Sequence, residues 1–228
     1  MHEFTIIIPV YNEELLIERN TKKLIEYLKK LDIKNYEIII SSNGSTDETN
    51  EIGKRLDKEI KEVKFIYVNE RGAGLAFNEA IKKAKYDKII SVDMDLSINL
   101  DFIPRALDLL FSNDIVIGSK KFGEQDRNYF RLFISNVYLF LVRFFLGINF
   151  SDYSIAAKAY KKKSVINYLD NDKGTFYVIR LVYLAYKNGL SVIEIPVSCK
   201  DNRKSKFNIY NEIFYRFKKL VLLSIKKK

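Results

Sequence analysis

Residues 89–97 read IISVDMDLS, which places two carboxylates directly after a short apolar run. The run at 89–92 has the β-branched bias of a buried strand. Ligands of open α/β sheets bind just beyond the carboxyl ends of such strands. Asp93 and Asp95 would there be hard oxygen ligands for Mg²⁺ or Mn²⁺, a metal that is usually bridged to substrate phosphates. A D-x-D pair also occurs in ordinary solvated turns, so its position after the strand is what favours a metal site.

Strand-like and helix-like segments alternate on both sides of this stretch. Continuous apolar strands that alternate with helices predict an α/β fold, with a mostly parallel central sheet covered on both faces. The strands are expected at Phe4–Val10, Tyr36–Ser41, Val63–Val68, Lys88–Val92 and Asp114–Gly118, and the helices at Glu13–Leu31, Thr46–Ile60, Gly72–Ala84 and Leu100–Phe111.

The second half of the chain is organised differently and is expected to form the acceptor side of a cleft. A polar loop at 120–128 precedes an apolar helix near 129–147, whose most apolar window, 132–148, is too short to span a bilayer. A short strand near Ser154–Tyr160, a helix near Phe176–Asn188 and a strand at Ser191–Val197 follow. No repeat or linker divides the chain, which reads as one compact unit.

The composition limits the chemistry of this chain. Its 228 residues are 47% hydrophobic, enough for the core of one α/β domain. Cys199 is the one cysteine, so a reducing compartment is expected and the residue is interpreted as a small side chain near a strand end. His2 is the one histidine, which excludes Ser–His and Cys–His nucleophilic pairs. Because Phe4–Val10 reads as the first strand, no signal peptide is expected and the predicted location is cytoplasmic.

The C-terminal end is strongly basic. Residues 200–228 contain ten Lys and Arg but two acidic residues, within a chain of net charge +10. An apolar stripe beside these cations is typical of a helix that lies on a membrane surface, and a helix docked on its own domain is an equally good interpretation. RNA binding ranks lower and no nucleic-acid partner is predicted, because no nucleic-acid module is present. The stripe consists of Tyr210, Ile213, Phe214, Phe217, Leu220 and Val221.

Three further loops follow expected strands, and each has a structural explanation beside a functional one. In PVYNE (9–13), Asn12 is a good helix N-cap. In SSNGSTD (41–47), capping by Ser45 or Thr46 is the stronger interpretation, although small polar residues also suit a nucleotide's base or ribose. In NERGAG (69–74), Arg71 and a helix N-terminus would favour phosphate, and the glycines would let the backbone approach a ligand. Four such loops in order favour a nucleotide and metal site.

The ordered segments TIIIPVYNEE, SSNGSTDET, NERGAGLAFNEAI, SVDMDLS and DIVIGSK resemble family 2 glycosyltransferases of the GT-A fold. Within that family the resemblance is closest to dolichol-phosphate (polyprenyl-phosphate) mannose and glucose synthases. The resemblance covers roughly residues 4–206. Residues 1–206 are expected to form a glycosyltransferase domain of the GT-A fold, and residues 207–228 a basic amphipathic C-terminal helix. RLFIS (131–135), DYS (152–154), EIPV (194–197) and RKSK (203–206) agree with it.

The resemblance implies a role for each matched residue. Asp93 and Asp95 would hold Mg²⁺ or Mn²⁺ against the donor diphosphate, and Lys120 stands where the family often has arginine. The residues implied in donor binding are Pro9, Tyr11, Glu13 and Asn43. The cations implied in contacting donor or acceptor phosphates are Arg71, Arg131, Arg203 and Lys206. Lys120 would join these cations unless it is a solvated loop charge.

The sequence also departs from the family pattern, which indicates a divergent branch. Two aspartates are common where Ser42 and Asn43 stand, and a glutamine is often found at the position of Ser97. Arg180 replaces a glutamate, and residues 156–157 are Ala-Ala in place of Gly-Phe. These changes leave the sugar and the base undetermined.

The resemblance implies an inverting transfer of a hexose from a nucleotide-diphosphate sugar of the GDP-mannose or UDP-glucose type to a polyprenyl (dolichyl) phosphate. The enzyme would lie peripherally on the cytoplasmic face of a membrane, with or without an integral-membrane partner. A sugar hydroxyl acceptor would instead require a carboxylate base, for which Asp152 is the first candidate, although a turn or helix cap explains this residue equally well. A nucleotide-binding partner of a membrane protein that has lost catalysis is the alternative of another class.

Overall fold

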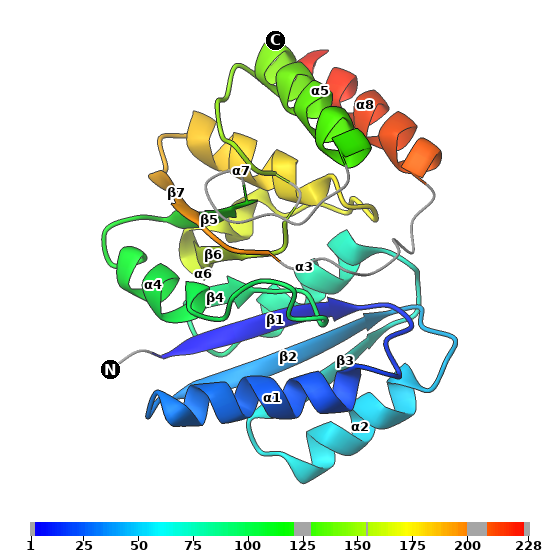
Figure 1. The fold of residues 1–228 in the computed structure, drawn as a ribbon, viewed down its shortest axis with the longest axis vertical. Helices are drawn as coiled ribbons and strands as arrows, with labels where there is room; N and C mark the ends of the chain where they lie inside the picture. The colour runs from blue at the N-terminus through cyan, green and yellow to red at the C-terminus, as the bar shows by residue number, and fades with distance from the viewer. Residues whose placement is uncertain (1–2, 121–128, 154, 200–208, 226–228) are drawn as a thin grey trace.

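The structure, a computed structural model, describes residues 3–120, 129–153, 155–199 and 209–225. Its elements alternate as Figure 1 shows. The strands are β1 (Phe4–Val10), β2 (Tyr36–Asn43), β3 (Val63–Val68), β4 (Lys88–Ser91), β5 (Ile115–Ser119), β6 (Lys158–Lys161) and β7 (Val192–Pro196). The helices are α1 (Ile17–Lys30), α2 (Thr49–Glu59), α3 (Ala73–Lys83), α4 (Phe102–Leu109), α5 (Tyr129–Leu146), α6 (Lys162–Val165), η2 (Ile166–Tyr168), α7 (Tyr177–Lys187) and α8 (Ile209–Ile225).

One seven-stranded sheet runs through the molecule in the order β3-β2-β1-β4-β6-β5-β7. The sheet is mostly parallel, as predicted. Of its seven strands, β6 runs antiparallel to both of its neighbours: Ala159 pairs with Ile90 of β4 on one side and with Val116 of β5 on the other. The strand predicted at Ser154–Tyr160 is shorter, at Lys158–Lys161, and α6 and η2 were not predicted.

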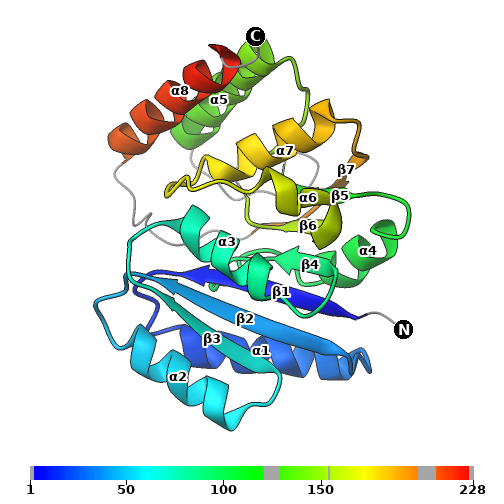
Figure 2. The same ribbon diagram turned by 180° about the vertical axis from the view of Figure 1, so that it is seen from behind.

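Helices cover both faces of the sheet, as the alternation predicts. α1, α2 and α4 pack on one face, and α3 and α7 on the other (Figures 1 and 2). Alternate residues of β1 divide between the two cores: Ile6 and Ile8 face α1, whereas Ile7 faces the core of α3 and α7. This arrangement leaves the carboxyl ends of β1 to β4 along one edge of the sheet, where four loops begin.

α5 and α8 lie side by side at one end of the molecule, beyond α7 (Figures 1 and 2). The rings of Phe145 and Phe217 meet edge to face with centroids 6.1 Å apart, and Leu220 is fully buried. α8 therefore docks on its own protein, as one of the two sequence interpretations predicted. The pair nevertheless leaves large apolar side chains exposed: Val137, Phe140, Phe144, Ile213, Phe214, Phe217, Leu222 and Ile225.

No helix in the part of the chain that the structure describes is long and apolar enough to cross a membrane.

A buried carboxylate, Asp172, anchors α8. Its Oδ2 accepts a hydrogen bond from Lys219 Nζ at 2.8 Å, and its Oδ1 accepts from Tyr215 Oη and from Gly174 N. Burial alone would raise the pKa of Asp172, but the hydrogen bonds from Lys219, Tyr215 and Gly174 outweigh it, so the pKa lies below its ordinary value of 3.8.

The anchor predicts a pH-dependent contribution to stability. Since the folded pKa of Asp172 is below the unfolded value, the contribution is complete above about pH 5 and is lost as the pH falls below 3.8 and through the folded pKa. Tyr215, which faces the carboxylate, keeps its proton in this range, because burial and the hydrogen bond to Asp172 raise its pKa. Asp172→Asn is expected to lower the free energy of unfolding by about 1.5–3 kcal/mol at pH 7. Urea unfolding should show this difference narrowing toward pH 3, whereas the exposed Asp32→Asn should show no such trend.

Candidate functional site

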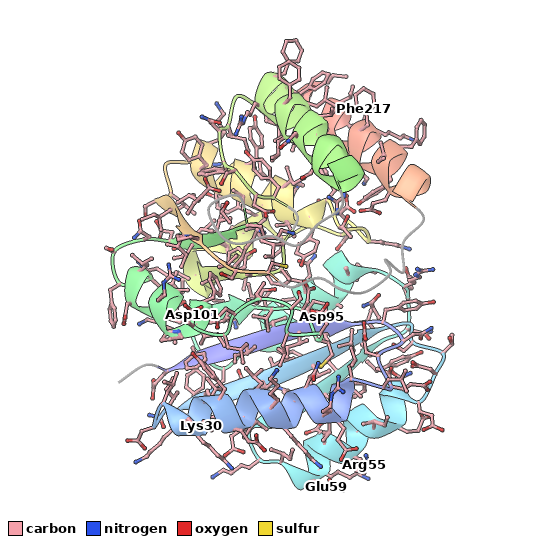
Figure 3. The ribbon with its side chains drawn as sticks, viewed as in Figure 1. Lys30, Arg55, Glu59, Asp95, Asp101 and Phe217 are labelled. Carbon is pink, nitrogen blue, oxygen red and sulfur yellow. The ribbon has the colours of Figure 1, made fainter. Side chains whose placement is uncertain are left out.

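The two predicted metal ligands follow β4 at the carboxyl edge of the sheet. Asp93 is exposed and Asp95 is half-buried, and Asp95 lies near the middle of the molecule (Figure 3). The turn is fixed locally, because Asp95 Oδ1 accepts a hydrogen bond from Ser97 N at 3.0 Å. Leu96 has a φ of +49°, which is unusual for a branched side chain and is the kind of strain found at functional sites. The sequence-predicted position of both carboxylates after a buried strand is confirmed.

These residues fit a hydrated divalent cation better than a closed metal site. Among the described residues, no group of three or more His, Cys, Asp and Glu is placed to hold a metal. Mg²⁺ is typically held by one or two carboxylates, several waters and the substrate's phosphates. Asp93 and Asp95 are therefore a suitable pair for a cation that binds together with a diphosphate.

The first and second loops are joined by side chains that the sequence assigned to helix capping. Asn12 Oδ1 accepts from Thr46 N at 2.8 Å, and Asn12 N donates to Ser45 Oγ at 3.1 Å. Glu13 N donates to Thr49 Oγ1 at 2.7 Å. α1 begins only at Ile17, and among the described residues no side chain caps the N-terminus of α1 or of α2. The capping interpretation was wrong: these polar side chains hold two loops together across more than thirty residues of sequence.

Asn43 connects three of the loops. It is 5% exposed, its Nδ2 donates to Val10 O at 2.7 Å, and its Oδ1 accepts from Gly72 N at 3.1 Å. An amide is suited to this position because it donates and accepts at once, whereas an aspartate has no donor for Val10 O. The asparagine that stands here, where the resemblance implies an aspartate, therefore makes both hydrogen bonds. A direct contact of Asn43 with the donor remains a prediction.

Asn43→Asp is expected to lower the free energy of unfolding by about 1–3 kcal/mol, because Val10 O loses its buried donor and a carboxylate faces it. Urea unfolding at pH 7 measures the loss. Asn99→Asp makes the same charge change at an exposed position that already accepts a hydrogen bond from Asp101 N, and it should change stability by less than about 0.5 kcal/mol. Equal losses in the two variants would contradict the connecting role of Asn43.

The third loop carries Arg71, whose guanidinium lies 4.3 Å from the centre of the Tyr11 ring. The two donor-site candidates of the first and third loops are thus in contact. A side chain has no room at either glycine of this loop: a Cβ on Gly72 would come within 2.6 Å of Lys173 O, and one on Gly74 within 2.1 Å of Asp172 O. Both glycines are thus required by the close approach of the chain's own backbone, and their role in the approach of a ligand stays a prediction.

Three buried charged side chains and a partly buried one, Glu194, form a cluster beneath this edge. Lys120 Nζ lies 3.9 Å from Asp152 Oδ2, and both side chains are less than 10% exposed, so Lys120 is not the solvated loop charge that was one interpretation. Asp152 Oδ1 accepts from Ile155 N at 3.2 Å, as expected of a turn residue. Glu194 Oε1 accepts from Asp152 N at 3.3 Å and completes the acidic side of the cluster. The cluster consists of Lys120, Asp152, Lys158 and Glu194.

Sequence reasoning missed Lys158 and Tyr177. Lys158 is 1% exposed, and burial lowers its pKa to about 8, although Asp152 and Asp93 act in the opposite direction. Burial and then the charge of Asp93 raise the pKa of Tyr177, so its hydroxyl stays protonated beside the metal-ligand candidate. The signal that could have revealed Lys158 is the presence of a lysine among the small and apolar residues of AAKAY (156–160).

The remaining candidates fall into two groups. Pro9, which pairs with Ser41 of β2 near the end of β1, and Glu13 in the first loop are both partly buried, and their contact with the donor stays a prediction. Cys199 is buried, as expected of a structural residue. Arg180 lies elsewhere, where it donates to Tyr168 O at 2.7 Å and pairs with Asp170 at 3.0 Å. Arg203 and Lys206 lie outside the described residues, as does the side chain of Arg131.

Comparison with known proteins supplies three findings. Residues 5–169 match the family model described as Glycosyl transferase family 2. Glycosyltransferase AglD of Haloferax volcanii is 27% identical over 219 residues, 92% of this chain and 35% of that protein. Undecaprenyl-phosphate 4-deoxy-4-formamido-L-arabinose transferase of Proteus mirabilis is 27% identical over 229 residues, 98% of this chain and 66% of its own length. The chain thus spans less than two thirds of these curated relatives.

Solved structures give the same picture of the fold. Glucosyl-3-phosphoglycerate synthase from Mycobacterium tuberculosis in complex with UDP superposes with a TM-score of 0.70 at 17% identity, covering 97% of this chain and 80% of that one. The same enzyme with Mn²⁺, UDP and glucosyl-3-phosphoglycerate gives a TM-score of 0.66 at 18% identity, over 98% and 78% of the two chains. At these identities the likeness concerns the fold alone, and it confirms the predicted α/β architecture.

Proposed function

Because this chain belongs to glycosyl transferase family 2 and has its GT-A fold, we propose that it transfers a hexose from a nucleotide-diphosphate sugar to a polyprenyl phosphate at a membrane surface. The observation that carries the proposal is the meeting of Asp93 and Asp95, the Tyr11–Arg71 pair and the joined first and second loops at one edge of the sheet. The name of the Proteus mirabilis relative, a transferase acting on undecaprenyl phosphate, supports this class of acceptor.

The donor would lie across the first three loops. Tyr11, with Pro9 and Glu13, lines the nucleoside side, and Arg71 is placed to bind the diphosphate while its guanidinium stacks on Tyr11. Asp93 and Asp95 would hold Mg²⁺ or Mn²⁺, which supplies positive charge to the leaving nucleoside diphosphate. The hydrogen bonds between the loops fix these groups before the donor arrives, which lowers the cost of ordering them.

A phosphate acceptor suits the buried cluster better than a hydroxyl acceptor does. A phosphate monoester has a second pKa of about 6, so it arrives largely ionised and needs no strong general base. Asp152, the candidate base for a hydroxyl acceptor, is paired with Lys120, and its oxygens accept hydrogen bonds from Lys120 N and Ile155 N. The cations of Lys120 and Lys158 would attract an acceptor phosphate, together with the predicted Arg131, Arg203 and Lys206.

The acceptor class also fits the exposed face of the α5–α8 pair, which we define as the exposed residues Val137, Phe140, Phe144, Ile213, Phe214, Phe217, Leu222 and Ile225. Lys226, Lys227 and Lys228 directly follow α8 in the sequence and carry positive charge. An apolar helix face beside lysines is suited to an anionic bilayer surface. Peripheral attachment to the cytoplasmic leaflet, with or without an integral-membrane partner, is part of the proposal.

The test is an extraction assay. Purified protein is mixed with polyprenyl phosphate in phosphatidylglycerol liposomes, Mg²⁺ or Mn²⁺, and labelled sugar donors that include UDP-glucose and GDP-mannose. We expect label to enter the organic phase from one donor, with dependence on the metal and on the phosphate of the acceptor. Transfer to a free sugar hydroxyl instead would favour the alternative acceptor, and nucleotide binding without transfer from any donor would favour the non-catalytic partner.

A further inference from the structure

α8 is connected to the loop between η2 and α7, residues 169–176, by more than the Asp172 anchor. Glu212 Oε1 accepts from Thr175 Oγ1 and from Arg216 Nε, the latter at 2.7 Å. Gly174 lies directly under Tyr215, since a Cβ there would come within 2.3 Å of the Tyr215 ring. The loop has no regular secondary structure, so side chains of α8 fix much of its position.

The same loop supports the start of α3. Gly74 N donates to Lys173 O at 3.3 Å, and Lys173 pairs with Glu70 of the third loop. The backbone oxygens of residues 172 and 173 occupy the space that side chains at Gly72 and Gly74 would need. A displacement of residues 172–173 would therefore either open a gap behind the third loop or press on its backbone.

The third loop in turn carries the donor-site candidates. Gly72 N donates to Asn43 Oδ1 at 3.1 Å, and Arg71, next to it, stacks on Tyr11. An unbroken series of contacts thus leads from Lys219 on α8 through Asp172 and residues 172–174 to Arg71. Its members come from three separate parts of the chain, namely α8, the loop at 169–176 and the third loop, and each contact is between described residues.

We propose that Asp172, Tyr215 and Lys219 are positioning residues for the donor site: the carboxylate, held by the two α8 side chains, sets where the third loop places Arg71. The proposal rests on the proposed function and deepens it, because it makes α8 part of the support of the donor site as well as a surface element. The sequence predicts a domain boundary between residues 206 and 207. The contacts of Asp172 connect α8, which follows this boundary, to loops that precede it.

The burial of Asp172 connects a change on α8 to the third loop. Asp172 is 7% exposed, so a carboxylate that loses Lys219 stays buried with fewer donors, and the loop relieves this by moving toward water. Since the third loop has no side chains at residues 72 and 74 to fill a gap, it follows the movement. A shift of about 1 Å in a group that binds a diphosphate is enough to weaken binding substantially.

The experiment compares Lys219→Met with Lys218→Met in the full chain. Both variants remove one positive charge from neighbouring positions of α8, and Lys218 makes none of the Asp172 contacts given above. Titration calorimetry with UDP and with GDP, each with Mg²⁺ or Mn²⁺, measures nucleotide affinity without any transfer. Steady-state assays then give KM for donor and acceptor separately.

We expect Lys219→Met to weaken nucleotide binding and raise the donor KM about tenfold, with kcat and the acceptor KM changed less than twofold. Lys219→Arg should restore most of the affinity, and Lys218→Met should match the wild type. Equal nucleotide affinities in the two methionine variants, or a rise in the acceptor KM alone, would overturn the proposal. If Lys219→Met does not fold, Tyr215→Phe removes only a hydroxyl donor and takes its place in the same comparison.

The proposed function and this inference fail in different ways. A wild-type protein that binds nucleotide but transfers no sugar contradicts the function and still permits the affinity comparison. A wild-type protein that binds neither UDP nor GDP would overturn both.

Discussion

Asp93→Asn is expected to lower kcat/KM for sugar transfer by at least about a hundredfold, and Asp95→Asn by a similar factor. A divalent cation at a leaving diphosphate contributes several kcal/mol to the transition state, and each 1.4 kcal/mol corresponds to a factor of ten in rate. In the described part of the chain these two carboxylates have no third metal-ligand candidate beside them. The loss of one charge therefore removes half of the carboxylate charge with which the protein binds the metal. The extraction assay measures the rate.

Asp101→Asn is the matched control for this result. Asp101 is a partly exposed carboxylate of the same turn-to-helix region, paired with Arg105 at 3.5 Å and well separated from Asp95 (Figure 3). It should retain activity within about twofold, because an exposed pair of this kind contributes 1 kcal/mol or less to stability. Asp93→Asn and Asp95→Asn should also weaken metal-dependent nucleotide binding. Full activity in either variant would remove the metal site from the mechanism.

Replacing Phe140, Phe144 and Phe214 by serine is expected to reduce binding to phosphatidylglycerol vesicles by about a hundredfold or more. The three side chains are 65%, 74% and 71% exposed, so they are available to enter a bilayer. Each fully buried phenylalanine contributes about 1.5–3 kcal/mol, and partial immersion of three rings still exceeds the 2.8 kcal/mol of a hundredfold change. Vesicle sedimentation measures the partition, and transfer to a short-chain soluble acceptor should be retained.

Phe111→Ser provides the control for the membrane prediction. Phe111 is 67% exposed but follows α4, away from the α5–α8 pair (Figure 1). Its replacement should leave vesicle binding unchanged. Equal loss from Phe111→Ser, or no loss from the triple variant, would show that the α5–α8 face is not the membrane surface. Binding to neutral phosphatidylcholine vesicles should be weaker for the wild type, because the lysines at 226–228 contribute only with anionic lipid.

Much of the site was open to prediction because it depends on local patterns and one geometric rule. A buried strand ends at Ser91, and carboxylates follow it, so Asp93 and Asp95 could be placed at the sheet edge without knowledge of any neighbour. Arg71 and Tyr11 were each assigned to that edge for the same reason. Their stacking could not be predicted, since it depends on the relative heights of the first and third loops.

The capping assignments failed for an instructive reason. Asn12 and Ser45 have the side chains of good N-caps, and a local reading offers them only their own helix as a partner. In the folded chain the neighbouring loop lies equally close, and Asn12 pairs with Thr46 instead. Local hydrogen-bonding capacity is a property of sequence, but the choice among partners belongs to the tertiary structure.

The sequence by itself determined the alternating elements, the mostly parallel sheet, the carboxylate pair at its edge and the family, because strand and helix periodicities and ordered motifs are written over short stretches of chain. Only the tertiary structure decided the reversed direction of β6, the burial of Lys158 near Asp152 and Glu194, and the hydrogen bonds from α8 to Asp172. Each of these joins residues that are neighbours in space but not in sequence. Their energies come from burial and charge pairing, which exist only after the chain has closed around them.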